Sequence, residues 1–158
     1  MTLILTSTAF DHMGAIPVIH TCQGDDVSPP LAWDGVPDGT QSLVLIVDDP
    51  DAPDPAAPKT TWVHWVLYDL PAQCVGLHQG AAVGGLPPRA RDGLNDWKRA
   101  GYGGPCPPIG RHRYVFKLYA LNAPLGDLGP RADKAAVLTA MDGKVMDKAE
   151  LIGTYAKG

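Results

Sequence analysis

The sequence predicts a mainly β fold in which a large antiparallel or mixed sheet carries a few helices at its edges. Three segments, residues 42–47, 62–70 and 113–121, contain apolar runs rich in β-branched and aromatic side chains. One segment alone has clear helical spacing, and strands and helices do not alternate regularly. The 18 glycines and 16 prolines follow no period, which indicates frequent turns.

The chain opens with two short predicted strands. Residues 2–6 are apolar and β-branched, and residues 31–33 follow a cluster of turn-forming residues. The longer apolar runs come next. The segment at 42–47 contains a continuous apolar run, Leu43 to Val47, and is bounded by Gly39 and Pro50, a pattern typical of a strand buried on both faces.

The last part of the chain contains the one convincing helix. It is predicted over residues 133–142, with Asp133 as its cap and Gly143 as its stop. A shorter helical turn is expected around residues 145–149. A closing extended segment is expected at residues 151–155.

Length and charge limit the classes of protein to which the chain can belong. At 158 residues it is expected to form a single domain, residues 1–158. The net charge of −4 argues against a nucleic-acid partner, because binding the phosphate backbone requires a basic face. No stretch reaches the roughly 18 apolar residues of a membrane span, and residues 1–7 lack the basic region of a secretory signal. These features predict a cytoplasmic protein.

The cysteines support the same location. Cys22, Cys74 and Cys106 are odd in number and show no CxxC spacing, which predicts free thiols in a reducing compartment. Cys106 lies near His112 in the sequence, so a thiolate nucleophile is conceivable there. The prolines on both sides of Cys106 argue against that role.

A loop rich in glycine and proline precedes the third apolar run. Seven of the ten residues at 101–110 are Gly or Pro, more than an ordinary connection needs. Because prolines reduce the entropy that a loop loses on ordering, this composition suits the wall of a preformed pocket. The loop belongs to a long irregular connection, residues 86–108, and such connections are usually functional.

Polar side chains lie at or near the ends of the predicted central strands. Asp49 follows the first strand, His64 lies near the start of the second, and His112 and Tyr114 begin the third. Alternate residues of a strand share a face. His112 and Tyr114 therefore point the same way, as do Trp62 and His64, and all of them are free to converge on one pocket.

Other chemistries have weaker support. Asp49, His64 and His112 form a conceivable iron or zinc site, but no HExxH pattern accompanies them. No GxSxG elbow supports a serine triad, and no Lys-Ser/Thr pair makes the glycine-rich loop a P-loop. The histidines without a partner at motif spacing are expected at the surface: His12, His20 and His78.

Four segments that carry these residues occur in order along the chain: Asp49-Pro-Asp-Ala-Pro53, Trp62-Val-His64-Trp65, Gly104-Pro-Cys-Pro-Pro-Ile-Gly110 and His112-Arg-Tyr114. As an ordered set they resemble the phosphatidylethanolamine-binding protein (PEBP) family. The compact third segment is similar to the bacterial Raf-kinase-inhibitor-like (YbhB/YbcL-type) branch, as are residues 28–33 and 151–155. The resemblance covers roughly residues 20–156.

The resemblance implies a large central sheet packed on a smaller one, peripheral helices, no cofactor and a small anion pocket at one end of the strands. The residues expected to line the pocket, carried over by motif, are Asp49, Trp62, His64, Pro107, Pro108, His112 and Tyr114. Asp51 and Arg113 match positions whose expected role is to hold the loops. Only three residues separate Pro108 from His112, a tighter link than in the animal members, which bears on the width of the entrance.

The function that the resemblance predicts is non-enzymatic binding of phosphate or phospholipid head groups. Histidines and Tyr114 are expected to donate hydrogen bonds to the phosphate, so binding should weaken well above the histidine pKa of about 6.5. Asp49 is also a candidate acceptor for an ethanolamine ammonium. Two alternatives stay open: a regulator that binds another protein, such as a kinase, and a hydrolase that uses His64 and Asp49. Exposed strand edges leave a homodimer open as well.

Overall fold

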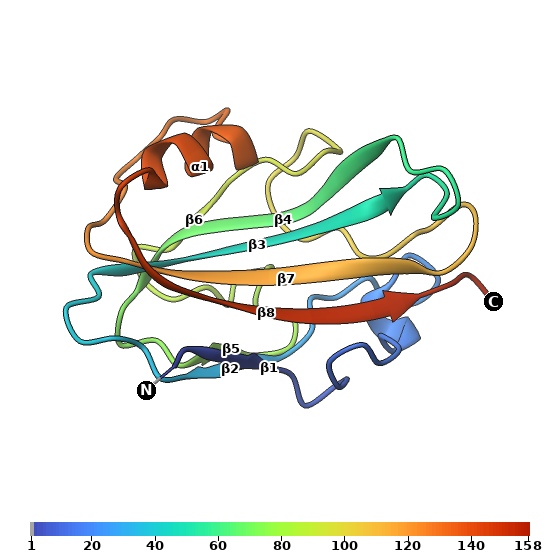
Figure 1. Cartoon of the computed structure of the whole chain (residues 1–158), viewed down its shortest axis with the longest axis horizontal. Helices are drawn as coiled ribbons and strands as arrows, with labels where there is room; N and C mark the ends of the chain where they lie inside the picture. The colour runs from blue at the N-terminus through green and yellow to red at the C-terminus, as the bar shows by residue number, and fades with distance from the viewer. Residues whose placement is uncertain (1) are drawn as a thin grey trace.

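A five-stranded antiparallel sheet forms the centre of this structure, a computed structural model that describes residues 2–158 (Figure 1). The strand order is β6-β4-β3-β7-β8, and every neighbouring pair is antiparallel. The mainly β fold predicted from the sequence is confirmed. The strands are β3 (Ser42–Ala52), β4 (Thr60–Pro71), β6 (Arg91–Asp92), β7 (His112–Leu121) and β8 (Val145–Tyr155).

A smaller sheet of three antiparallel strands faces the large one, and Figure 1 shows it below. Its order is β1-β2-β5. Its strands are β1 (Ile4–Thr6), β2 (Leu31–Asp34) and β5 (Gly76–Leu77). Leu5 and Trp33 of the small sheet belong to the same buried cluster as Leu45 and Phe116 of the large sheet. The main apolar core therefore lies between the two sheets.

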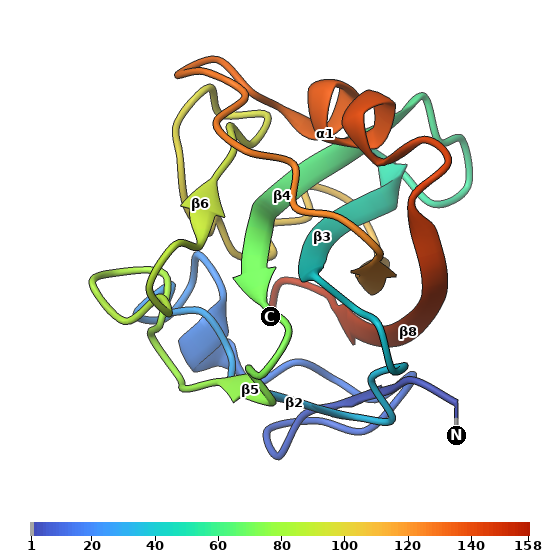
Figure 2. The same cartoon turned by 90° about the vertical axis from the view of Figure 1, so that its left-hand side faces the viewer.

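The opposite face of the large sheet is covered by helix α1 (Lys134–Met141), as the turned view in Figure 2 shows. Val137 of the helix packs in a second buried cluster with Ile46 of β3. Residues 43–47 of β3 are at most 1% exposed, so this strand is buried on both faces, as its continuous apolar run predicted. Asp133 caps the helix by accepting a hydrogen bond from the backbone N–H of Ala136 at 3.0 Å.

The helices are few and short. α1 has eight residues, and the 3₁₀ helix η1 (Val18–His20) has three. Within residues 2–158 no helix is long and apolar enough to cross a membrane.

Strand β8 runs through the segment for which the sequence predicted a helical turn, so the prediction at 145–149 is wrong. Met146 and Lys148 favour a helix locally, but β8 pairs with β7 along the whole length of that strand. Without β8 the backbone groups of β7 would lack partners on one side. The buried residues of β8 alternate from Ala149 to Tyr155, which is the period of a strand with one face on the core.

The end of β3 meets the starts of β4 and β7, because β3 runs antiparallel to both. Asp49 pairs with Trp62 across β3 and β4, and Asp48 pairs with Val115 across β3 and β7. The pairing of β3 with β4 shifts register after Val47 and again after Asp49. Such bulges re-aim side chains and are common next to functional sites. The polar residues at the predicted strand ends therefore lie at one edge of the sheet.

Cys22 and Cys106 form a disulfide, so the prediction of three free thiols is wrong. Their Cα atoms lie 5.4 Å apart although 84 residues separate them in sequence. An odd count is compatible with one bridge and one free thiol, Cys74, and a missing CxxC pattern excludes only local pairing. The thiol argument for a cytoplasmic location falls away. Beside the disulfide, the backbone N–H of Cys22 donates to the carbonyl of Pro105 at 3.1 Å, so the bridge ties the Gly/Pro loop to the segment after η1.

Reduction of this disulfide is expected to lower the free energy of unfolding by about 2–4 kcal/mol, because the crosslink restricts the unfolded chain across a long loop. Chemical denaturation of the oxidised protein, the reduced protein and Cys106→Ser measures the loss. Cys74→Ser keeps the bridge and serves as the control, whose sensitivity to reductant should match the wild type. Equal denaturation midpoints for oxidised and reduced wild type would contradict the prediction.

Candidate functional site

A cavity of about 290 Å³ lies where β3 ends and β4 and β7 begin. The residues that line it are Asp49, Ala52, Pro53, Trp62, His64, Trp97, Cys106, Pro107, Pro108, His112 and Tyr114. All seven residues predicted from the sequence are among them. The sequence reasoning missed the other four as lining residues.

The register of the strands explains why these side chains share one cavity. Asp49 continues the face of β3 on which Leu45 and Val47 pack toward the small sheet, and Tyr114 of β7 belongs to that same core. The Gly/Pro loop is joined to β4 at His64 by two hydrogen bonds. The backbone N–H of Gly103 donates to the His64 carbonyl at 3.0 Å, and the His64 Nδ1 contacts the Gly103 carbonyl at 2.7 Å. The loop is thereby held as a wall beside the strand ends.

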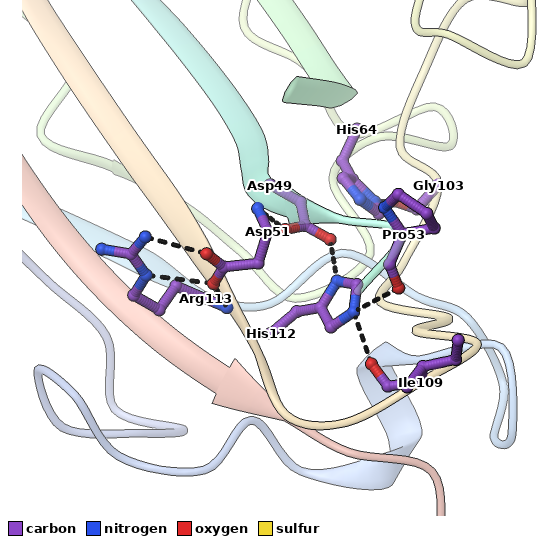
Figure 3. A network of polar contacts seen from close by, with 8 residues as sticks. All are labelled: Asp49, Asp51, Pro53, His64, Gly103, Ile109, His112 and Arg113. Atoms are coloured by element: carbon purple, nitrogen blue, oxygen red, sulfur yellow. Dashed lines mark hydrogen bonds and ion pairs between the residues drawn. The ribbon is translucent and has the colours of Figure 1, made fainter. Parts of the chain in front are cut away.

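Asp49 and His112 form a buried hydrogen-bonded pair at the centre of the site (Figure 3). The Asp49 Oδ2 lies 2.5 Å from the His112 Nδ1, and the Asp49 Oδ1 accepts the backbone N–H of Asp51 at 2.7 Å. The His112 Nε2 faces two carbonyl oxygens, that of Ile109 at 2.8 Å and that of Pro53 at 3.1 Å. Since carbonyls only accept, Nε2 carries a hydrogen, and one further proton lies between Nδ1 and the carboxylate. Neither ring nitrogen is free for a ligand.

This arrangement bears on two of the chemistries left open by the sequence. A metal site built from Asp49, His64 and His112 would need a lone pair on His112, and both of its nitrogens already face acceptors. Within residues 2–158 no three His, Cys, Asp or Glu side chains gather as a metal-binding group. The sulfur of Cys106 is part of the disulfide, so it is not a free thiolate.

His64 is buried, and its Nδ1–H donates to the Gly103 carbonyl. Burial lowers the pKa of the ring, and the Gly103 carbonyl and the charge of Asp49 oppose that shift only in part. The neutral ring therefore keeps its hydrogen on Nδ1 and a lone pair on Nε2. The rings of Tyr114 and Trp97 contact it edge-on, each with its centroid 5.1 Å away, and so fix its orientation.

Two buried donors at the cavity have no acceptor. Among the described residues, four buried polar side-chain atoms make no hydrogen bond: the Tyr114 hydroxyl, Trp62 Nε1, Trp65 Nε1 and Asp92 Oδ1. Of these residues, Tyr114 and Trp62 line the cavity. Burial, together with the negative charge of Asp49, raises the pKa of Tyr114, so the side chain stays a phenol and can donate. Buried polar groups in proteins are nearly always paired. Tyr114 and Trp62 are therefore residues of the cavity wall whose donors have no acceptor within the described part of the protein.

Asp51 and Arg113 form an ion pair next to the cavity and do not line it. The Arg113 Nε and Nη2 donate to the two Asp51 carboxylate oxygens at 3.0 and 2.8 Å, and the Arg113 backbone N–H donates at 2.8 Å (Figure 3). The guanidinium lowers the pKa of Asp51. This two-point contact fastens the end of β3 to the start of β7.

His20 is buried, so its prediction as a surface residue is wrong. Its Nδ1 contacts the Val27 carbonyl at 3.0 Å, and its own carbonyl accepts the Tyr102 hydroxyl at 2.7 Å. These partners come from segments with no common motif, so spacing along the sequence contains no signal for them. Trp97 was missed for the same reason, since it reaches the cavity rim from the long connection before the Gly/Pro loop.

The protein thus consists of two facing antiparallel sheets with a cavity at the strand ends of the larger sheet. The model of the family "Phosphatidylethanolamine-binding protein" matches residues 6–156, and the chain belongs to this family.

Individual relatives are similar over nearly the whole chain. A "UPF0098 protein" of Methanothermobacter thermautotrophicus is 48% identical over 155 residues, which cover 98% of this chain and 99% of that protein. The crystal structure of the PEBP homolog CT736 from Chlamydia trachomatis has 41% identity and a TM-score of 0.89, with 99% of each chain covered. The structure of E. coli YbcL, described as a member of the mammalian PEBP family, has 32% identity and a TM-score of 0.90, with 100% of each chain covered.

Acidification from pH 7 to pH 5 is expected to lower the free energy of unfolding through His64 and His20. Burial lowers the pKa of both rings below the usual histidine value of about 6.5, so in this window the unfolded chain binds protons that the native state does not. Stability present above pH 6.5 is then lost as the pH falls, by up to about 1.4 kcal/mol per pH unit for each histidine. Urea denaturation across the window measures the slope.

His64→Gln and His20→Gln should each reduce that slope, whereas exposed His78→Gln should leave it unchanged. A free energy of unfolding that stays constant between pH 7 and pH 5 would show that the buried rings do not resist protonation.

Proposed function

We propose that this protein binds a phosphate-bearing small molecule or lipid head group in the cavity at the ends of β3, β4 and β7. The observation that carries the proposal is the pair of unpartnered buried donors on Tyr114 and Trp62, both of which line the cavity. Leaving a buried donor unpaired costs about 1–3 kcal/mol. Two such donors at one cavity support an acceptor that a ligand supplies.

A phosphate suits this set of groups because its tetrahedral oxygens point in several directions. Tyr114 comes from β7, and Trp62 and His64 come from β4, so the polar groups lie on different walls. The volume of about 290 Å³ is at the lower end of the range of ligand pockets, about 300–1,000 Å³, which favours a head group over a whole lipid. Membership of the phosphatidylethanolamine-binding protein family supports the same ligand class.

The rim of the cavity favours a ligand with an organic substituent. Trp97, a lining residue, is 39% exposed, and Pro107 and Pro108 add further apolar surface to the lining. A free phosphomonoester and the head group of a phospholipid share the chemistry that this site recognises.

The proposal is one of binding without turnover. Asp49, the carboxylate that a hydrolase would use as a base, has one oxygen on His112 and the other on the backbone of Asp51. The same contacts disfavour Asp49 as the main acceptor for an ethanolamine ammonium. Release of inorganic phosphate or alcohol from the ligands named below would contradict this part of the proposal.

Inorganic phosphate, phosphoethanolamine and glycerophosphoethanolamine should each raise the Tm of the wild type in thermal-shift titrations. A ligand that binds only the native state stabilises it by mass action, by about 2.7 kcal/mol at 100 times its Kd. His64→Ala should lose most of the shift, and His78→Ala, which removes an exposed imidazole outside the cavity, should retain it. No shift with any of the three ligands would contradict the proposal and favour a protein-binding role.

Tyr114→Phe should weaken phosphate binding without destabilising the free protein. The lost hydrogen bond to a charged ligand corresponds to about 1.5–3 kcal/mol, or roughly 10- to 150-fold in Kd. Because the hydroxyl has no partner in the free protein, its removal should leave the free energy of unfolding unchanged or higher. Calorimetric titration and denaturation measure the two effects, with Tyr119→Phe as the control on the opposite face of β7. A destabilised variant with unchanged affinity would assign the hydroxyl to the framework of the protein.

A further inference from the structure

The lining of the cavity contains no cationic side chain: none of its eleven residues is Lys or Arg. The Asp49–His112 pair has no net charge, whichever of the two holds the shared proton. Nearby guanidinium groups are directed elsewhere, since Arg113 binds Asp51 and Arg99 lies over the Trp97 ring, 5.9 Å from its centroid. With His64 neutral, the net charge of the lining is zero.

The polar groups of the lining are of two opposite kinds. Tyr114 and Trp62 offer hydrogens without acceptors, whereas the neutral His64 offers a lone pair on Nε2, which makes no hydrogen bond within residues 2–158. The Gly103 carbonyl fixes this tautomer, because it requires the hydrogen on Nδ1. A fully deprotonated phosphate would place an oxygen lone pair against the Nε2 lone pair.

The surroundings of His64 do not supply a positive charge to resolve that conflict. Asp49 and Asp48 of β3 and Asp26 of the loop after η1 favour protonation of the ring, but burial has the larger opposite effect. From β7, Tyr114 faces the ring as a neutral phenol, and the shared proton of His112 is balanced by Asp49.

The walls offer few backbone donors in compensation. Pro53, Pro107 and Pro108 line the cavity, and proline has no N–H. Other phosphate sites offset a double charge with guanidinium groups or a row of backbone N–H groups. The lining described here has no guanidinium group and is rich in proline.

We infer that phosphate binds in the cavity with a single negative charge and with one proton held at the His64 Nε2. A monoester monoanion supplies that proton itself and is therefore the preferred ligand. This inference rests on the proposed function. In the complex the ligand P–O–H and the His64 Nε2 share the proton. No covalent bond forms or breaks.

The class of ligand decides where that proton comes from. A monoester monoanion brings its own proton, and the site then exchanges none with solvent. A monoester dianion, or a diester, which has no proton to give, requires His64 to take one from water. Affinity for a monoester should therefore fall as the pH rises above its second pKa of about 6.

The test is calorimetric titration with methyl phosphate and dimethyl phosphate, each in two buffers of different ionisation enthalpy, which counts the protons taken up on binding. At pH 5 dimethyl phosphate should take up about one proton more than methyl phosphate, because methyl phosphate is then mostly the monoanion. At pH 8 both should take up about one proton. The apparent affinity for methyl phosphate should fall roughly 100-fold between the two pH values.

His64→Gln assigns the proton to its site, since an amide donates or accepts without titrating. In this variant, proton uptake at pH 8 should vanish and the affinity for methyl phosphate should become nearly independent of pH. His78→Gln, which removes an exposed titratable ring, should behave as the wild type. The proton counts of the wild type test the inference even if His64→Gln fails to fold.

The experiment distinguishes failure of this inference from failure of the proposed function. Methyl phosphate that binds at pH 8 without proton uptake would be bound as the dianion, which overturns the inference and leaves the proposed function standing. One proton taken up at pH 8 by His64→Gln would move the proton to the Asp49–His112 pair and overturn the assignment to His64. Binding of neither ligand at either pH would overturn the proposed function itself.

Discussion

The hydrogen-bonded pair of Asp49 and His112 is the interaction on which the rest of the site depends. It joins the end of β3 to the start of β7, and the His112 Nε2 also holds the carbonyls of Pro53 and Ile109, one from each loop at the cavity. Breaking a buried pair by removing one partner costs about 3–5 kcal/mol, because the other partner is left buried and unpaired. Asp49 and His112 therefore serve as the framework of the site, and the proposed ligand contacts are made by neighbouring side chains.

Much of the fold and the location of the site were predictable from the sequence. The apolar run at 43–47 indicated a strand buried on both faces because it has no polar residue on either face, and this signal can be read from the segment by itself. Strand periodicity placed Trp62 with His64 and His112 with Tyr114, and antiparallel pairing brought these residues to one edge. The alternation of side chains along a strand could not show which ring nitrogens of His64 and His112 are hydrogen-bonded. Those contacts include carbonyls of distant loops.

The features that sequence reasoning missed depend on contacts between distant segments. Cys22 and Cys106 lie 84 residues apart, and nothing near either residue identifies its partner. Residues 145–149 of β8 resemble a helical turn locally but form a strand through their pairing with β7. His20 is buried by residues that share no pattern with it, and Trp97 reaches the cavity from an irregular connection.

The unpartnered polar groups of the cavity come from strands, whereas most of its apolar walls come from loops. Trp62, His64 and Tyr114 belong to β4 and β7, while Trp97, Cys106, Pro107 and Pro108 belong to segments outside any sheet. Loops accept insertions and substitutions that sheet strands do not. Selection can therefore reshape the entrance for a new substituent while the atoms that meet the phosphate keep their positions, so head-group recognition and tail preference can evolve as separate traits.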